Sequence, residues 1–69
     1  MTTIEVSMNG RPLRTPAATL AELLRHQGYA ADAAVACAVN HEFVPRAQWP
    51  AHELDDGDRI DVVSPITGG

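Results

Sequence analysis

Residues 19–28, TLAELLRHQG, carry the clearest helix signal in the chain. Thr19, followed three residues later by Glu22, forms a capping box, in which the hydroxyl and the carboxylate accept hydrogen bonds from free N–H groups at a helix start. Three leucines then fall at positions i, i+3 and i+4 on one helical face: Leu20, Leu23 and Leu24. Gly28 fits the left-handed conformation that ends a helix. A single amphipathic helix needs another layer to cover its apolar face.

The other apolar residues follow strand patterns that can supply this layer. Residues 3–8 (TIEVSM) alternate apolar and polar side chains, as a half-buried strand does. Asn9 and Gly10 suit the two positive-φ positions of a type I′ hairpin turn, and residues 11–15 return from it. Pro12 has no N–H to donate, so this return strand is predicted at a sheet edge. Further strands are predicted at residues 35–39, 42–44 and 59–63.

The predicted order of elements is strand, strand, helix, strand, short strand, strand. This order indicates an α+β fold with a mixed sheet of four to five strands and one main helix packed on one face. Between the last two strands, residues 46–50 are expected to form an irregular turn in which Trp49 packs its ring on the domain. We expect residues 1–63 to form the domain and residues 64–69 (SPITGG) to form a flexible C-terminal tail.

The tail has the composition of a segment that enters another protein. Pro65 has no backbone donor, and Gly68 and Gly69 have no side chains, so sheet pairing should stop near residue 64. Six extended residues reach about 20 Å, and we expect Pro65, Ile66, Thr67 and Gly68 to be the residues that enter a partner's channel. The carboxylate of Gly69 is an anion at neutral pH, so it needs activation before a group can be loaded onto it.

Composition limits the classes of function. Sixty-nine residues make one domain, which leaves little room for an internal active site. The net charge is −4 and all five cations are arginines, so the chain has no basic stripe suited to nucleic acid. No apolar run approaches the ~20 residues that span a bilayer, and no signal segment precedes the first strand, which predicts a cytoplasmic protein without a membrane partner.

Isolated reactive side chains in the sequence indicate neither catalysis nor a metal site. Cys37 is the one thiol, and its place between valines on a strand face favours a buried, inert cysteine over a persulfide carrier. His26, His41 and His52 match no common metal-ligand spacing, so surface histidines are expected. No nucleophile, base and acid are placed together, so we expect that the chain is not an enzyme.

Docking is the alternative role for several polar and aromatic residues. Five acids gather near the last strand: Glu53, Asp55, Asp56, Asp58 and Asp61. Aspartates favour turns, but a negative flank containing Asp56 and Asp58 would also steer the domain toward a basic rim on a partner. Phe43 is expected either in the core or in an apolar docking patch. Arg46 either pairs with the acidic region or supports Trp49. The sequence leaves these alternatives open.

Several blocks of the chain resemble the ThiS family, the ubiquitin-like β-grasp sulfur carriers of thiamine biosynthesis. The blocks are residues 19–24 (TLAELL), 39–40 (VN), 43–49 (FVPRAQW), 54–60 (LDDGDRI) and 68–69 (GG). The helix and the acidic turn recur in many β-grasp proteins. The Val-Pro-Arg-x-x-Trp pattern together with a Gly-Gly end is more specific. Two tail residues depart from the family pattern: Thr67 stands where a small apolar residue is frequent, and Pro65 stiffens the tail.

The resemblance implies a carrier cycle. An E1-like adenylating enzyme of the ThiF type would use ATP to adenylate the Gly69 carboxylate, and sulfur from a persulfide donor would displace AMP. The resulting thiocarboxylate would donate sulfur to a thiazole synthase of the ThiG type. On this interpretation the chain binds no cofactor, carries sulfur covalently at its C terminus, catalyses nothing alone and is a monomer when free.

Two other interpretations are compatible with the residues. One is the same chemistry for another acceptor, as in the small subunit of molybdopterin synthase, whose members are usually longer and lack the Val-Pro-Arg-x-x-Trp block. The other is a β-grasp binding or regulatory module whose Gly-Gly end is idle. Deletion of Gly69 separates a carrier from a binding module, because the module would retain its partner affinity.

Overall fold

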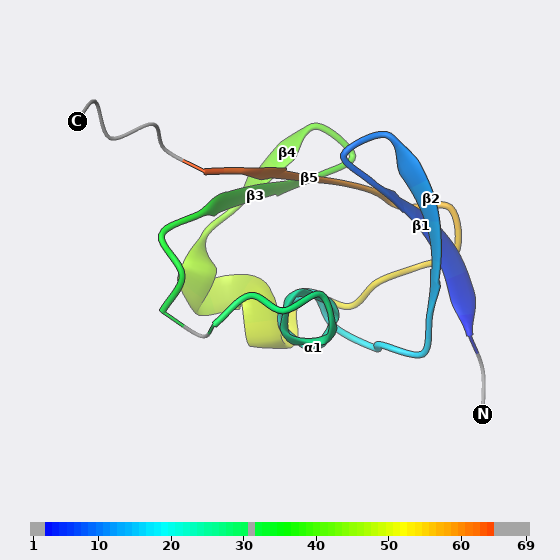
Figure 1. Ribbon diagram of the computed structural model, residues 1–69, viewed down its shortest axis with the longest axis horizontal. Coiled ribbons are helices and arrows are strands. Elements are labelled where there is room, and N and C mark those ends of the chain that lie inside the picture. The colour runs from blue at the N-terminus through cyan, green and yellow to red at the C-terminus, as the bar shows by residue number, and fades with distance from the viewer. Residues whose placement is uncertain (1–2, 31, 65–69) are drawn as a thin grey trace.

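The computed structural model describes residues 3–30 and 32–64. In chain order its elements are β1 (Ile4–Met8), β2 (Arg11–Thr15), α1 (Leu20–His26), β3 (Ala36–Val39), β4 (Glu42–Val44), the 3-10 helix η1 (Arg46–Ala51) and β5 (Arg59–Val63). The sheet order is β2-β1-β5-β3-β4, with β1 and β5 parallel and the other neighbours antiparallel. Figure 1 shows the sheet arching over α1. The predicted mixed sheet with one helix on one face is confirmed, as is the edge position of β2.

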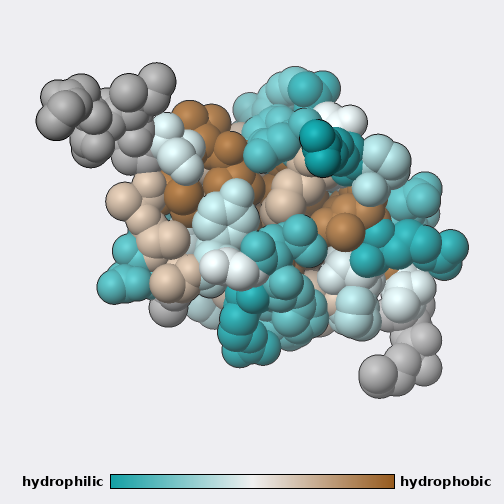
Figure 2. Space-filling view, viewed as in Figure 1, coloured by the Kyte–Doolittle hydropathy of each residue, from teal (hydrophilic) through white to brown (hydrophobic). Residues whose placement is uncertain are grey.

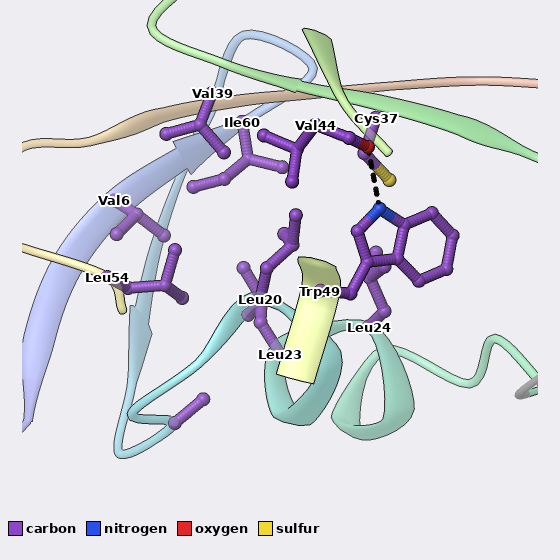
Figure 3. Close-up of a cluster of buried hydrophobic side chains, with 11 residues drawn as sticks. Val6, Leu20, Leu23, Leu24, Cys37, Val39, Val44, Trp49, Leu54 and Ile60 are labelled. Carbon is purple, nitrogen blue, oxygen red and sulfur yellow. Dashed lines mark hydrogen bonds between the residues drawn. The ribbon is translucent and has the colours of Figure 1, made fainter. Parts of the chain in front are cut away.

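The core lies between α1 and the concave face of the sheet. Leu20, Leu23 and Ile60 have no exposed surface, and the leucines of α1 point toward the underside of the strands in Figure 3. Burial of each such side chain contributes roughly 1.5–3 kcal/mol. Leu54, on the segment before β5, closes the side of this core near Val6. The predicted apolar faces of the helix and the strands therefore meet as expected.

The start of α1 differs in one detail from the predicted capping box. Thr19 Oγ1 accepts a hydrogen bond from the Glu22 N–H at 3.2 Å, as predicted. Glu22 Oε1 instead accepts from the Ala18 N–H at 3.4 Å, one residue before the cap. At the other end Gly28 has φ +94°, the left-handed conformation predicted for it. Both ends of α1 are therefore fixed by local residues.

The segment after β4 is more regular than predicted. Instead of an irregular turn it forms the six-residue η1, which begins after Pro45 and contains Pro50. Trp49 is buried, and its Nε1–H donates to the Val44 carbonyl at 2.9 Å. This bond satisfies the polar atom of the indole, so its ring can fill the space between α1 and the sheet. The predicted packing of Trp49 on the domain is confirmed.

Cys37 is buried, as the sequence predicted, with 1% of its surface exposed. Its environment is the apolar cluster shared by β3, β4 and α1. Burial raises the pKa of the Cys37 thiol above its ordinary value of 9.0, and the positive charge of Arg46 offsets part of this rise. The folded protein therefore holds this thiol in the protonated, unreactive form.

Replacement of Cys37 by alanine should make the free energy of unfolding of the domain depend less on pH in the alkaline range. The unfolded chain releases the thiol proton near the ordinary pKa, whereas the folded chain retains it, so unfolding becomes easier as pH rises past that value. The wild-type free energy of unfolding should lose up to about 1.4 kcal/mol per pH unit from this thiol, between its unfolded and folded pKa values. Urea unfolding of both proteins between about pH 8 and pH 10 measures the difference. Equal pH dependence would show that Cys37 does not titrate differently in the two states.

Candidate functional site

The strand that leads to the tail lies in the middle of the sheet. β5 pairs with β1 on one side and with β3 on the other, and Val63, its last residue, lies opposite Ala36 of β3. Ser64 is the last residue of this end that the structure describes. The five predicted tail-site residues lie outside the described residues: Pro65, Ile66, Thr67, Gly68 and Gly69. The structure therefore shows the base from which the tail departs.

Two asparagine side chains extend the pairing of β5. Asn9 Oδ1 accepts from the Val62 N–H at 2.8 Å, and Asn40 Oδ1 accepts from the Arg59 N–H at 2.9 Å. Both asparagines have positive φ, 51° and 53°, in the turns after β1 and β3. The sequence indicated turns at these positions because asparagine tolerates this conformation. It gave no signal that the side chains would bond to β5, which is far away along the chain.

The acidic turn before β5 is held by its own carboxylates. Asp58 is buried, with Oδ1 accepting from Asn40 Nδ2 at 3.0 Å and Oδ2 from the Asp55 N–H at 2.8 Å. Asp56 is exposed, but its Oδ1 accepts from the Glu5 N–H at 2.7 Å. Both carboxylates therefore stabilise the turn through the hydrogen bonds that they accept. Docking by Asp56 and Asp58 stays a prediction, and of the two only Asp56 offers its charge at the surface.

An apolar patch covers the convex face of the sheet beside the end of β5. Phe43 is 68% exposed and Val63 62% exposed. Strand register places Ala38 opposite Phe43 and Ala36 opposite Val63, so these four residues share the face turned away from α1. We call them the outer apolar patch. Figure 2 shows hydrophobic surface over the adjoining ends of β3 and β5. A core position for Phe43, one of the two alternatives from the sequence, is wrong.

Arg46 supports Trp49. Its guanidinium lies 4.8 Å from the centroid of the indole ring, within the range of a cation–π interaction. Its Nη2 also donates to the Ala33 carbonyl, in the segment before β3. Arg46 thereby connects η1 to the segment that leads into β3.

The described residues provide neither a metal site nor a membrane-spanning segment. Within residues 3–30 and 32–64, no group of three histidine, cysteine or carboxylate side chains is arranged to hold a metal ion. His26 and His41 are exposed and His52 is half-buried. In that same part of the chain, no helix has the length and apolar character needed to cross a bilayer.

Comparison with known proteins identifies the family. The model of the ThiS family matches residues 6–69, which include all but the first three described residues of the body and extend to the Gly-Gly end. The chain belongs to the ThiS family. The sulfur carrier protein ThiS of Escherichia coli (strain K12) is 32% identical to this ThiS-family chain over 66 residues, which cover 96% of this chain and all of the relative.

Solved structures of thiamine biosynthesis proteins share the fold. The crystal structure of ThiS from Geobacter metallireducens superposes with a TM-score of 0.80 at 26% identity, covering 96% of this chain and all of that one. The solution structure of a thiamine biosynthesis protein from the same organism gives a TM-score of 0.75 at 26% identity, covering 96% of this chain and 88% of that one. The β-grasp fold inferred from the sequence is therefore confirmed.

Truncation of Asp58 to alanine should destabilise the domain, although substitutions of charged residues in turns usually have small effects on stability. The change leaves Asn40 Nδ2 and the Asp55 N–H without their acceptor, which costs about 1–3 kcal/mol. Asp55→Ala is the matched control, because the Asp55 side chain is exposed and its backbone bonds remain; its effect should stay within about 0.5 kcal/mol. Urea unfolding at neutral pH measures both. Equal stability of the two variants would show that the Asp58 bonds do not stabilise the turn.

Proposed function

We propose that this chain is a sulfur carrier in thiamine biosynthesis and that it acts through the carboxylate of Gly69. The observation that carries the proposal is the family match, which continues through residue 69 and is accompanied by full-length similarity to the sulfur carrier ThiS of Escherichia coli. The central position of β5 beside the outer apolar patch adds support. A partner that holds this patch would lie close to the base of the tail.

The proposed chemistry activates the carboxylate outside the domain. In an E1-like, ThiF-type enzyme, an oxygen of the Gly69 carboxylate attacks the α-phosphorus of ATP and pyrophosphate leaves. The terminal sulfur of a persulfide then attacks the carbonyl carbon, and AMP leaves. Attack by a thiol on the resulting acyl disulfide releases a disulfide and the thiocarboxylate. ATP is thus a substrate of the partner, and the carrier retains only the sulfur.

In the proposed cycle, the thiocarboxylate then delivers its sulfur to a ThiG-type thiazole synthase. Thiocarboxylate sulfur is a soft nucleophile, comparable to a thiolate, and attacks a carbon electrophile in the thiazole precursor. Residues 1–63 serve as the body that partners recognise, and residues 64–69 as the tail that enters their active sites, with Pro65, Ile66, Thr67 and Gly68 occupying the partner's channel. Phe43 and Asp56 are the exposed docking residues in this scheme.

Loss of Gly69 should abolish sulfur loading without affecting the fold. Intact-mass measurement of the full chain, incubated with its adenylating enzyme, ATP and a persulfide donor, should show one carboxyl oxygen replaced by sulfur. The chain lacking Gly69 should show no replacement and an unchanged urea unfolding curve, because the buried core of the described residues is formed by positions 6 to 60. Loading elsewhere in the chain would contradict the proposed site. Unaltered partner affinity with no loading of either chain would favour the binding-module interpretation.

Replacement of Phe43 by serine should weaken recognition by the adenylating enzyme without destabilising the domain. A phenylalanine side chain buried in an interface contributes about 1.5–3 kcal/mol, so the KM for the carrier should rise roughly 10- to 100-fold at similar kcat. Arg14→Ser is the control, since Arg14 is exposed on β2, at the opposite edge of the sheet from β4. Pyrophosphate release during adenylation measures both constants. Equal KM values for the two variants would remove the outer apolar patch from the docking surface.

A further inference from the structure

A hollow lies on the helical side of the molecule, between α1 and η1. It has a volume of about 260 Å³ and is lined by residues of both helices and of the segment after α1, including Leu24, Arg25, Tyr29, Arg46, Trp49 and Pro50. We call it the α1–η1 pocket. At ~30 Å³ per water molecule it offers the space of about nine waters, enough for one bulky side chain.

The walls of the α1–η1 pocket are largely apolar. Leu24 and Trp49 are buried, and Tyr29 is half-buried against the same cluster. The indole N–H of Trp49 is already bonded to the Val44 carbonyl, so the small part of this buried ring that lines the pocket presents carbon atoms and no free polar group. Figure 3 shows the indole beside Leu24 with its nitrogen turned toward the strands. An apolar side chain would therefore be accommodated better than a polar one.

The rim of the pocket is positive, although the chain as a whole carries a charge of −4. Arg25 on α1 and Arg46 on η1 line it, and none of the described carboxylates does. Within the described part of the chain, no carboxylate lies within ion-pair distance of Arg25. Glu22, the acid of the same helix, turns its carboxylate back to the Ala18 N–H at the helix start. A negatively charged occupant would therefore complement this positive rim.

The pocket is also connected to the base of the tail. Arg46 lines a shallower hollow together with Val35, Ala36 and Val63, at the end of β5. The two hollows therefore share one side chain, and a protein that encloses the departing tail would reach the α1–η1 pocket along this surface.

We propose that the α1–η1 pocket binds an acidic segment of the enzyme that processes the tail, with one leucine or phenylalanine side chain filling the pocket and a neighbouring carboxylate paired with Arg25. The identity of this partner rests on the proposed function, whereas its chemistry follows from the apolar walls and the positive rim. The contact lies on the helical layer, whereas the outer apolar patch lies on the convex face of the sheet, so it gives the partner a second point of contact with the carrier.

Titration of the full-length, ¹⁵N-labelled protein with short peptides tests the pocket directly. The probe is the acetylated and amidated peptide EELFDE, compared with KKLFKK and EESSDE. The acidic, apolar peptide alone should shift the amide signals of Leu24, Arg25 and Tyr29 and the indole signal of Trp49. Arg25→Glu should weaken this binding at least tenfold. Arg14→Glu, an equal charge change on the exposed β2 strand, should leave it unchanged.

Four results would overturn the proposal: no shifts at millimolar peptide, equal shifts with the basic peptide, shifts confined to the outer apolar patch, or equal effects of the two arginine variants. A fifth concerns the chain's own tail. If ending the chain at Ser64 moves the pocket signals before any peptide is added, the occupant is the tail and a partner segment is excluded.

The pocket and the proposed function can fail separately. Deletion of Gly69 should not change the peptide titration. If the full-length chain binds the peptide but is never loaded with sulfur by its adenylating enzyme, the carrier function is refuted and the pocket remains. In the adenylation assay, Arg25→Glu should raise the KM for the carrier while loading still reaches completion. A KM equal to that of Arg14→Glu would refute the pocket as an enzyme contact and leave the carrier function.

Discussion

The fold depends on the pairing of β5 along both of its edges. β5 is the last strand in sequence but lies between β1 and β3, and its Ile60 is fully buried against the leucines of α1. The sheet is therefore complete only when the C-terminal strand is in place. Long-range pairing of this kind is entropically costly to close. It also fixes the base of the tail rigidly, because Val63 is held opposite Ala36 at the point where the tail begins.

Local signals were sufficient to predict most of the fold. The capping box, the leucine spacing and Gly28 located α1, and alternation with turn residues located the strands. Contacts between distant segments were not predictable in this way. The bonds from Asn9 and Asn40 to β5, and from Asp56 to β1, join residues whose partners no local pattern identifies. The regular form of η1 likewise depends on two contacts of Trp49: the packing of its ring between α1 and the sheet, and its hydrogen bond to the Val44 carbonyl.

The features of the candidate site also differ in whether local sequence patterns could predict them. The tail residues stay a prediction, made from sequence because proline and paired glycines have distinctive backbone properties. The exposed residues of the body could not be predicted from local patterns, because exposure depends on which face of a strand is covered. Phe43 fits a core position or a patch equally well until the register with β3 places it on the convex face. The sequence also left open whether Arg46 contacts the acidic region or Trp49, and the structure places its guanidinium over the ring of Trp49.

The reactive side chains of the body are consistent with a carrier of an activated carboxyl group. An acyl adenylate is attacked readily by amines and thiolates, so such groups near the tail would divert the carrier into internal bonds. The chain contains no lysine, and arginine guanidinium groups are poor nucleophiles. Its one thiol is buried, and burial raises the pKa of Cys37, which holds it in the protonated form. The interior that stabilises the fold therefore also buries the one side chain that would compete best with a persulfide for the activated carboxyl group of the proposed cycle.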